Sequence, residues 1–304
     1  MERTFVIVNP AAGNKKPMKI WSEISAFFEN NNITIVSAFT KGKRDSQEIA
    51  RKIDLDSFEN LIVVGGDGTM NEVLNGLMLN EKSVENINLG MIPVGTGNDW
   101  GKTHGFTDDY QDSLRNLLSF SKIRQDIGLI SFYNDGKKDE RYFLNVAGIG
   151  YDALVAKKVN EDKERNFAGR FLYMKNLLSS LIEFKTASCE IRLDNSVLLN
   201  EELFSLSIGI GKYNGGGMMQ LPKADPADGI FDITLIKPVT KLDIIRQLKN
   251  LYDGTFIKHP AVSTYKAEKI TVNSSEKLFL ETDGEFIGHT PVEITILPRK
   301  INVI

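Results

Sequence analysis

The chain has 304 residues, of which 41% are hydrophobic and 25% are charged, and its formal net charge is −3. This composition is ordinary for a globular protein, and the nearly balanced charge predicts no attraction to nucleic acid. The single cysteine, Cys189, excludes an internal disulfide and any multi-cysteine zinc site. No apolar run reaches the roughly 18 residues of a membrane-spanning helix, so we expect a cytoplasmic protein that associates with membranes only transiently.

Up to about residue 125, short apolar runs alternate with helical patterns. Strands are expected at 5–8, 33–39, 61–64 and 89–93, and helices at 17–30, 45–53, 69–80 and 109–121. Pro17 suits a first helical turn, and Asp45 is a candidate helix cap. This alternation predicts βαβ units with a mostly parallel sheet.

From about residue 126, alternating apolar and polar runs dominate instead. They lie at 126–134, 141–149, 189–195, 203–210, 231–238, 266–274, 277–284 and 292–297, with helices expected at 150–160, 170–184 and 240–252. So many short strands separated by Gly, Asn and Asp turns predict an antiparallel β-sandwich. The fold class is therefore an α/β domain followed by an all-β domain, with Cys189 packed inside a strand.

Three loops follow expected strands of the first half, at 8–16, 63–72 and 92–102. The carboxyl ends of parallel strands meet at one edge of a sheet, where ligands bind. Glycines let backbone N–H groups approach phosphate oxygens, and Thr69, Thr96 and either Lys15 or Lys16 can add contacts. Ordinary turns without a ligand are the alternative, since neither GxxxxGK[ST] nor GxGxxG occurs.

Asp67 stands between glycines in the stretch GGDGT. A bare carboxylate repels phosphates unless a cation intervenes, and Mg²⁺ prefers one or two carboxylates together with waters and substrate phosphates. A magnesium contact, direct or through water, explains Asp67 better than a turn does. A role as general base stays open.

GGDGTMNEVLNGL followed by IPVGTGNDWGK resembles the catalytic domain of diacylglycerol and sphingosine kinases. Nearly the whole chain is similar to the bacterial soluble lipid kinases related to diacylglycerol kinase. GGDGT is shared with NAD kinases and phosphofructokinases, whereas GTGND is more specific to lipid kinases. The resemblance implies an NAD kinase/phosphofructokinase-like nucleotide-binding domain at 1–125, a β-sandwich lipid-substrate domain at 126–297, and a tail at 298–304 that rejoins the first domain.

The strand-end loops and the resemblance together give the expected ATP-binding residues. These are Asn9, Pro10, Gly13, Lys15, Thr40, Gly65, Gly66, Asp67, Gly68, Thr69, Asn71, Glu72, Gly95, Thr96 and Asn98.

Two stretches of the second half carry the other expected site residues. ADPADG is a turn or, as the resemblance implies, a structural Mg²⁺ loop that uses the Asp228 side chain and carbonyls near Asp225 and Ile230; Ala227 stands where relatives often have a second acid. DGE is a hairpin turn that, by the resemblance, also holds the catalytic base. Glu285 is then the likelier base, with Asp283 and Asp67 in an Asp–water–Mg²⁺ network.

An apolar helix is expected at 169–184, with Phe171, Met174, Leu178 and Leu181 on one face and Leu172, Leu177 and Ile182 beside them. A buried core helix is the default, and a helix that lines a lipid pocket or touches the bilayer is the alternative. Nearby basic residues either form a solvated face or meet anionic headgroups: Lys157, Lys158, Lys163, Arg165 and Arg170.

The expected function is that of an ATP-dependent lipid kinase, which transfers the γ-phosphoryl group to a lipid hydroxyl at the membrane surface. Diacylglycerol is the leading acceptor and gives phosphatidic acid. The alternatives are a soluble-metabolite kinase of the NAD kinase type and a non-catalytic nucleotide-binding regulator. A homodimer is possible.

Overall fold

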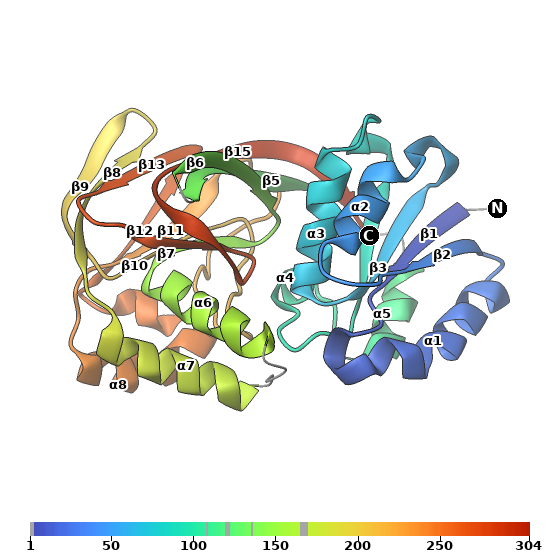
Figure 1. The fold of residues 1–304 in the computed structure, drawn as a ribbon, viewed down its shortest axis with the longest axis horizontal. Coiled ribbons are helices and arrows are strands. Elements are labelled where there is room, and N and C mark those ends of the chain that lie inside the picture. The colour runs from blue at the N-terminus through green and yellow to red at the C-terminus, as the bar shows by residue number, and fades with distance from the viewer. Residues whose placement is uncertain (1–2, 108, 119–121, 135, 165–169) are drawn as a thin grey trace. The chain divides into compact units, whose positions relative to one another are not determined.

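The computed structural model describes residues 3–107, 109–118, 122–134, 136–164 and 170–304. The chain folds into two compact units (Figure 1). Unit 1 comprises Met1–Ile127 and Pro298–Ile304, and unit 2 comprises Gly128–Leu297. The strand β15 (Glu285–Val303) contributes residues to both.

Unit 1 is built on a parallel sheet in the order β4-β3-β1-β2. Its strands are β1 (Arg3–Val8), β2 (Thr34–Phe39), β3 (Asn60–Gly65) and β4 (Asn88–Pro93). The end of β15 adds a short parallel pairing to β4, with Asn302 opposite Asn88. All residues of β3 and β4 are buried, as their continuous apolar runs predict for strands covered on both faces.

The helices of unit 1 connect these strands. They are α1 (Ala12–Asn30), α2 (Asp45–Lys52), α3 (Asp67–Met78), α4 (Asp99–Thr103) and α5 (Tyr110–Leu117), with 3₁₀ turns η1 (Leu55–Ser57) and η2 (Val84–Asn86). The α3 residues that recur at helical spacing, Met70, Val73, Leu74 and Leu77, are buried.

Two details of unit 1 differ from the expectation. The first helix begins at Ala12 rather than Pro17, but Gly13, Asn14 and Lys15 have left-handed dihedrals, so regular helix starts only beyond them. The cap position of α2 is Arg44, and Asp45 is the first helical residue; its carboxylate accepts the backbone N–H of Lys41 at 2.6 Å.

Unit 2 is an antiparallel β-sandwich. One sheet runs β12-β11-β10-β7-β14-β15, and β15 also pairs with β13, which leads on to β8 and β9; β5 pairs with β6 and with β15. The strands are β5 (Ile123–Asn134), β6 (Lys137–Phe143), β7 (Val146–Gly150), β8 (Ala187–Leu193), β9 (Ser196–Leu203), β10 (Ser205–Gly209), β11 (Phe231–Ile236), β12 (Val262–Ala267), β13 (Lys269–Ser274) and β14 (Phe279–Thr282).

The sandwich encloses one apolar core of Ile, Leu, Val and Phe side chains from these strands. Phe143 and Phe231 stack at its centre, with ring centroids 5.8 Å apart and both side chains fully buried. Cys189 lies in the same core, and burial raises the pKa of its thiol to about 11. The expectation of a packed strand thiol is confirmed.

Three helices cover the outer face of the β7-β10-β11 sheet (Figure 1). They are α6 (Tyr151–Glu164), α7 (Arg170–Glu183) and α8 (Lys241–Asp253), followed by the turn η3 (Thr255–Lys258). A second apolar cluster forms between these helices and the sheet, around Tyr151, Val155, Leu177 and Phe204. Within the described parts of the chain, no helix has both the length and the apolar character needed to cross a membrane.

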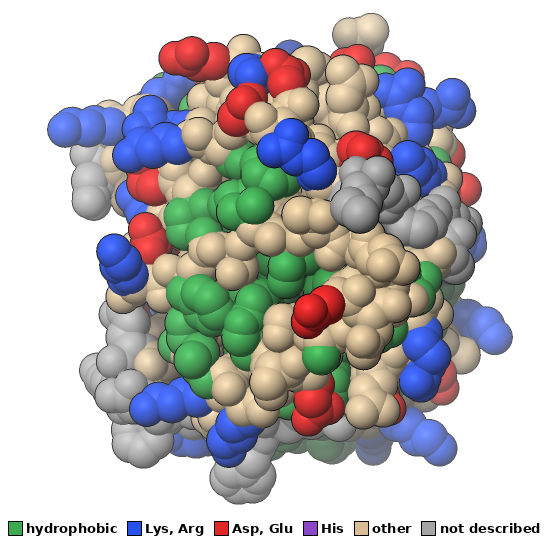
Figure 2. All heavy atoms as spheres, turned by 90° about the vertical axis from the view of Figure 1, so that its right-hand side faces the viewer, with side chains coloured by type: hydrophobic (Ala, Val, Ile, Leu, Met, Phe, Trp, Pro, Cys, Tyr) green, Lys and Arg blue, Asp and Glu red, His purple; other side chains and the backbone are tan. Residues whose placement is uncertain are grey.

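Figure 2 shows one face of the molecule in space-filling form. Apolar side chains gather in patches near its middle, and side chains of both charge signs lie around them. The mixed signs on this face agree with the small formal net charge of the whole chain, −3.

Candidate functional site

The parallel register of unit 1 brings three strand ends to one level. Val8 lies opposite Val64, and Gly65 lies opposite Pro93. The ladder continues past the strands, because Asn9 donates its backbone N–H to the Val64 carbonyl at 3.0 Å and Val94 donates to the Gly65 carbonyl at 2.9 Å. The three expected loops therefore leave the sheet side by side, as the sequence predicts.

Glycines allow these loops to pack backbone against backbone. A Cβ atom on Gly66 would lie 3.0 Å from the Cα of Gly95, and a Cβ on Gly95 would lie 2.7 Å from the Cα of Gly66. Gly13 has a φ of +50°, and a Cβ there would lie 1.8 Å from the Val94 carbonyl oxygen. Side chains at these positions would force the loops apart, so the glycines have a packing role that does not depend on a ligand.

Side-chain amides tie the same loops together. Asn9 Nδ2 donates to Thr69 Oγ1 at 2.9 Å, which joins the loop after β1 to the first turn of α3. Asn98 closes the GTGND loop on itself, since its Oδ1 accepts the Gly95 N–H at 3.0 Å and its Nδ2 donates to the Gly95 carbonyl at 3.1 Å. These contacts fix the backbone of the loops relative to one another.

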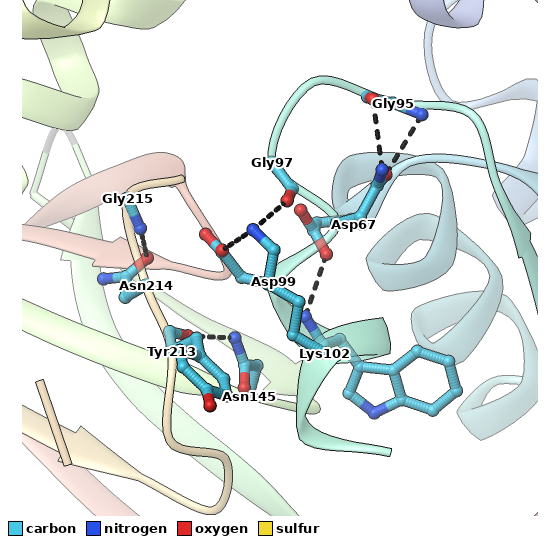
Figure 3. A network of polar contacts seen from close by, with 11 residues as sticks. Asp67, Gly95, Gly97, Asp99, Lys102, Asn145, Tyr213, Asn214 and Gly215 are labelled. Carbon is cyan, nitrogen blue, oxygen red and sulfur yellow. Dashed lines mark hydrogen bonds and ion pairs between the residues drawn. The ribbon is translucent and has the colours of Figure 1, made fainter. Parts of the chain in front are cut away.

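Asp67 is the first residue of α3. Its Oδ1 accepts the backbone N–H of Trp100 at 3.1 Å, and a Cβ on Gly97 would lie 3.0 Å from its Oδ2 and 3.5 Å from the Oδ2 of Asp99. Lys102 donates to the Gly97 carbonyl at 2.6 Å and pairs with Asp99 Oδ1 at 3.2 Å (Figure 3). Two carboxylates and an ammonium thus surround one glycine.

Asp99 and Lys102 are site residues that the sequence reasoning missed. Both lie in the quoted stretch IPVGTGNDWGK, three residues apart, but α4 itself was not expected there. The available signal was the acid–lysine spacing at the start of a possible helical turn.

The surroundings of Asp67, next to Gly97 at the start of α3, fit the single magnesium contact expected of this residue. Among the described residues, no group of three or more His, Cys, Asp or Glu side chains could hold a metal ion by itself. Mg²⁺ needs only one or two carboxylates when substrate phosphates supply other ligands. The Asp67 carboxylate meets that requirement, whereas Asp99 is paired with the Lys102 ammonium.

Other expected nucleotide-binding residues have partners inside unit 1. Glu72 accepts the Arg44 N–H at 2.9 Å and the Ser46 hydroxyl, which ties α3 to the start of α2. Asn71 is completely buried, and its carbonyl accepts from Asn75 Nδ2 at 2.9 Å. Thr40 donates its N–H to the Val8 carbonyl at 2.9 Å. Pro10 and Gly68 are half-buried, and Lys15 and Thr96 are exposed.

The half-buried His104 caps the end of α4 and supports this helix through Gln125. His104 Nε2 lies 2.6 Å from Gln125 Oε1, which also accepts the indole N–H of Trp100 at 3.0 Å. Burial lowers the pKa of His104 to about 4, so its ring is neutral at pH 7. Because Trp100 also binds Asp67 through its backbone, this cluster helps to position the acid.

In unit 2, the DGE stretch forms the expected turn, between β14 and β15. Asp283 is buried there with a φ of +50°, and its carboxylate accepts three backbone N–H groups, from Leu144 at 3.0 Å, Asn145 at 3.0 Å and Val146 at 3.1 Å. So many donors fix a carboxylate firmly. Asp283 therefore anchors the turn to the start of β7; its part in a magnesium network stays a prediction.

Glu285 follows this turn, and Asn160 of α6 holds the backbone on both sides of it. Asn160 Nδ2 donates to the Gly284 carbonyl at 3.1 Å, and its Oδ1 accepts the Phe286 N–H at 2.8 Å. Glu285 itself is half-buried. Its backbone is therefore fixed while the residue is partly exposed, which suits a general base. No motif or pattern in the sequence pointed to Asn160 as a residue of this site.

An apolar cavity of ≈ 70 Å³ lies between the α6–α8 helices and the sheet of unit 2. Its lining is mostly aliphatic and aromatic: Tyr151, Val155, Tyr173, Leu177, Phe204, Met218, Ile236, Val239, Ile244, Leu251, Phe256 and Val262, with Asp152, Ser207, Gln220, Asp243, Gln247 and His259 as polar members. Tyr173 and Leu177 come from the expected apolar helix, whose pocket-lining alternative this cavity matches.

Other described residues of that helix, and the basic residues described near it, do not line the cavity. Leu181 is buried, but Leu178 and Ile182 are 40% and 76% exposed, so the expected face is only partly buried. Lys157 lies 4.5 Å from the ring centroid of Phe279, and Lys158 pairs with Glu183 at 2.8 Å; Lys163 is exposed. Arg165 and the side chains of Arg170, Phe171 and Leu172 lie outside the described residues.

The 225–230 loop does not fit the structural Mg²⁺ ion that the resemblance implies. Asp228 Oδ1 accepts the Ile230 N–H at 3.2 Å, and Asp225 Oδ1 accepts the Ala227 N–H at 3.0 Å. The Lys266 ammonium lies 2.8 Å from Asp228 Oδ2 and 3.2 Å from Asp232 Oδ2. A metal ion at Asp228 would be repelled by this ammonium, which already neutralises the acids.

The first prediction concerns the pH dependence of stability. The folded state keeps His104 neutral down to about pH 4, whereas the unfolded chain takes up the proton near pH 6.5. The free energy of unfolding should therefore lose a contribution as the pH falls from 6.5 to 4. Urea unfolding should show this slope in the wild type and a shallower one in H104Q, and an NMR titration of His104 near pH 6.5 would contradict it.

The second prediction concerns Lys266. K266M should lower the free energy of unfolding by about 1 kcal/mol, because Asp228 and the buried Asp232 lose their cation. The Tm of the wild type should be the same in Mg²⁺ and in EDTA. K269M is the matched control, since Lys269 pairs with Glu293 at an exposed position. A wild-type Tm that falls in EDTA would show that a metal ion holds this loop.

Comparison with known families accounts for nearly the whole chain. The family model described as "Diacylglycerol kinase catalytic domain" matches residues 3–130, and "YegS C-terminal NAD kinase beta sandwich-like domain" matches residues 145–304. A Bacillus subtilis (strain 168) protein named diacylglycerol kinase is 28% identical over 306 residues, covering 100% of this chain and 96% of that protein.

Solved structures share the fold. A diacylglycerol kinase from Bacillus anthracis str. Sterne aligns with a TM-score of 0.71 at 24% identity, covering 100% of this chain and 96% of that one. An NAD kinase from Archaeoglobus fulgidus, solved with ATP, aligns with a TM-score of 0.52 at 13% identity, covering 99% and 92%. The expected NAD kinase-like α/β fold with a β-sandwich is confirmed. The chain belongs to the family of diacylglycerol kinase-like lipid kinases that combine this catalytic domain with a YegS-type C-terminal domain.

Proposed function

We propose that this family member is an ATP-dependent kinase that transfers the γ-phosphoryl group to a lipid hydroxyl, with diacylglycerol as its acceptor. The observation that carries the proposal is the corner of unit 1 where Asp67, at the start of α3, lies beside the GTGND loop. The names of the relatives support the lipid class of the acceptor.

Unit 1 is assigned to the nucleotide. The N-terminus of α3 presents backbone N–H groups, which favour phosphate oxygens, and the loop from Gly95 to Asn98 lies beside it, closed by the Asn98 side chain. Asp67 would hold a Mg²⁺ ion, which when bound neutralises charge on the phosphates. The adjacent Lys102 is a further cation at the same edge. In this assignment the chain orients the triphosphate and balances its charge.

Unit 2 is assigned to the lipid. Its cavity is lined mainly by apolar side chains, among them residues of α6, α7, α8 and β11, which suits a hydrocarbon chain. A soluble metabolite such as a dinucleotide would leave its polar groups without partners against these walls. This lining favours a lipid acceptor over the metabolite alternative.

Glu285 is assigned as the general base that takes the proton of the acceptor hydroxyl. Its backbone is fixed by Asn160, and the preceding Asp283 anchors the turn to β7. A base held in this way loses little conformational freedom when the acceptor arrives, so more of the binding energy is available for the transfer.

The third prediction tests this assignment with labelled ATP, Mg²⁺ and mixed micelles of single lipids. The wild type should label diacylglycerol faster than phosphatidylglycerol, sphingoid bases or aqueous acceptors such as NAD. D67A and E285A should each lower kcat/KM by roughly 10²- to 10⁴-fold, the usual range for a positioned acid or base.

Matched acids elsewhere serve as controls. D112A changes an exposed acid on α5 that pairs with Arg115, and E293A changes an exposed acid on β15 that pairs with Lys269. Both should keep the wild-type rate. Labelling of a lipid that is insensitive to D67A and E285A would overturn the site assignment, and faster labelling of an aqueous acceptor would overturn the lipid class.

A further inference from the structure

A further acid, Glu281, lies just before the turn between β14 and β15, at a buried position where a carboxylate is unusual. Glu281 belongs to β14 and is 1% exposed. A β-bulge between Leu280 and Glu281 shifts the pairing with β15, and such bulges redirect side chains near functional sites. Gly148 lies directly opposite on β7, where a Cβ would be only 2.6 Å from Glu281 Oε1. The glycine therefore makes room for the carboxyl group.

Both oxygens of Glu281 have a donor. Oε2 accepts the backbone N–H of Gly284 at 2.8 Å, in the middle of the turn. Oε1 accepts from Asn214 Nδ2 at 2.8 Å, and Asn214 is itself fixed because its Oδ1 accepts the Gly215 N–H at 2.9 Å (Figure 3). Glu281 thus connects the turn to the loop that follows β10.

The contacts continue from Asn214 to the wall of the apolar cavity. Gln220 Oε1 lies 3.4 Å from Asn214 Nδ2 and accepts the Ser207 hydroxyl at 3.1 Å. Ser207 Oγ also lies 3.1 Å from Asp152 Oδ2. Asp152, Ser207 and Gln220 all line the cavity. One buried polar chain therefore runs from the cavity wall to the turn that carries Glu285.

We propose that Glu281 is a positioning residue for the transfer reaction: it holds Gly284, and with it Glu285, in one conformation, and the Ser207–Gln220–Asn214 contacts tie that conformation to the wall of the apolar cavity. The role in catalysis rests on the proposed function. Glu281 touches the turn backbone rather than the reacting atoms, so its loss should lower kcat and leave nucleotide binding unchanged.

The fourth prediction compares E281Q with T282V. E281Q keeps the size of the side chain but puts an amide N–H₂ where one of the two donors needs an acceptor. T282V is the control, because among the described residues the buried Thr282 hydroxyl has no hydrogen-bond partner and valine has its shape. E281Q should lower kcat by roughly 10- to 100-fold with the KM for ATP unchanged. T282V should retain the wild-type values.

The unchanged KM for ATP separates positioning from general damage. A wild-type kcat in E281Q would overturn the proposal, as would an equal loss in T282V.

A measurement that needs no turnover tests the contact independently of the acceptor lipid. Hydrogen exchange of the Gly284 amide in the full chain should be faster in E281Q than in the wild type, and unchanged in T282V. If no lipid is phosphorylated but the Gly284 amide behaves as expected, the proposed function fails while the positioning contact stands. Unchanged exchange in E281Q would overturn the contact itself.

Discussion

The register of the parallel strands β1, β3 and β4 is the constraint on which the candidate site of unit 1 depends. Backbone hydrogen bonds past Val8 and Gly65 place three loops at one level, so residues far apart in sequence become neighbours. The glycines then allow those loops to touch backbone to backbone. Asp67 gains its position from this arrangement and from Trp100, which His104 and Gln125 support from the core.

In unit 2, the turn before Glu285 is held instead by buried polar groups on the helix-covered face of a sheet. An uncompensated buried carboxyl group is costly, so Asp283 and Glu281 persist only because backbone amides and Asn214 satisfy them. These contacts hold the short turn before Glu285 in place. The same face carries the apolar cavity, so the cavity wall and the turn share one set of hydrogen bonds.

Much of the fold and of the candidate site could be predicted, because these features depend on local sequence patterns. Apolar runs ending in glycine gave the strands of unit 1 and the meeting of their loops, and DGE gave the turn between β14 and β15. Glu281 could not be found, because alternation places it on the outer face of a sandwich, and only α6 makes that face buried. Lys266 lies opposite Asp232 through a long-range register that the sequence does not reveal, so the ion pairs beside the 225–230 loop could not be predicted.

The most direct test of the central claim is a crystal structure of the full chain with a non-hydrolysable ATP analogue and Mg²⁺. The account predicts the triphosphate at the carboxyl ends of β1, β3 and β4, with its oxygens bound by backbone N–H groups after Gly65 and in the loop from Gly95 to Asn98. The Asp67 carboxylate should contact the metal ion directly or through one water. Phosphates bound away from this edge, or a metal ion without contact to Asp67, would contradict it.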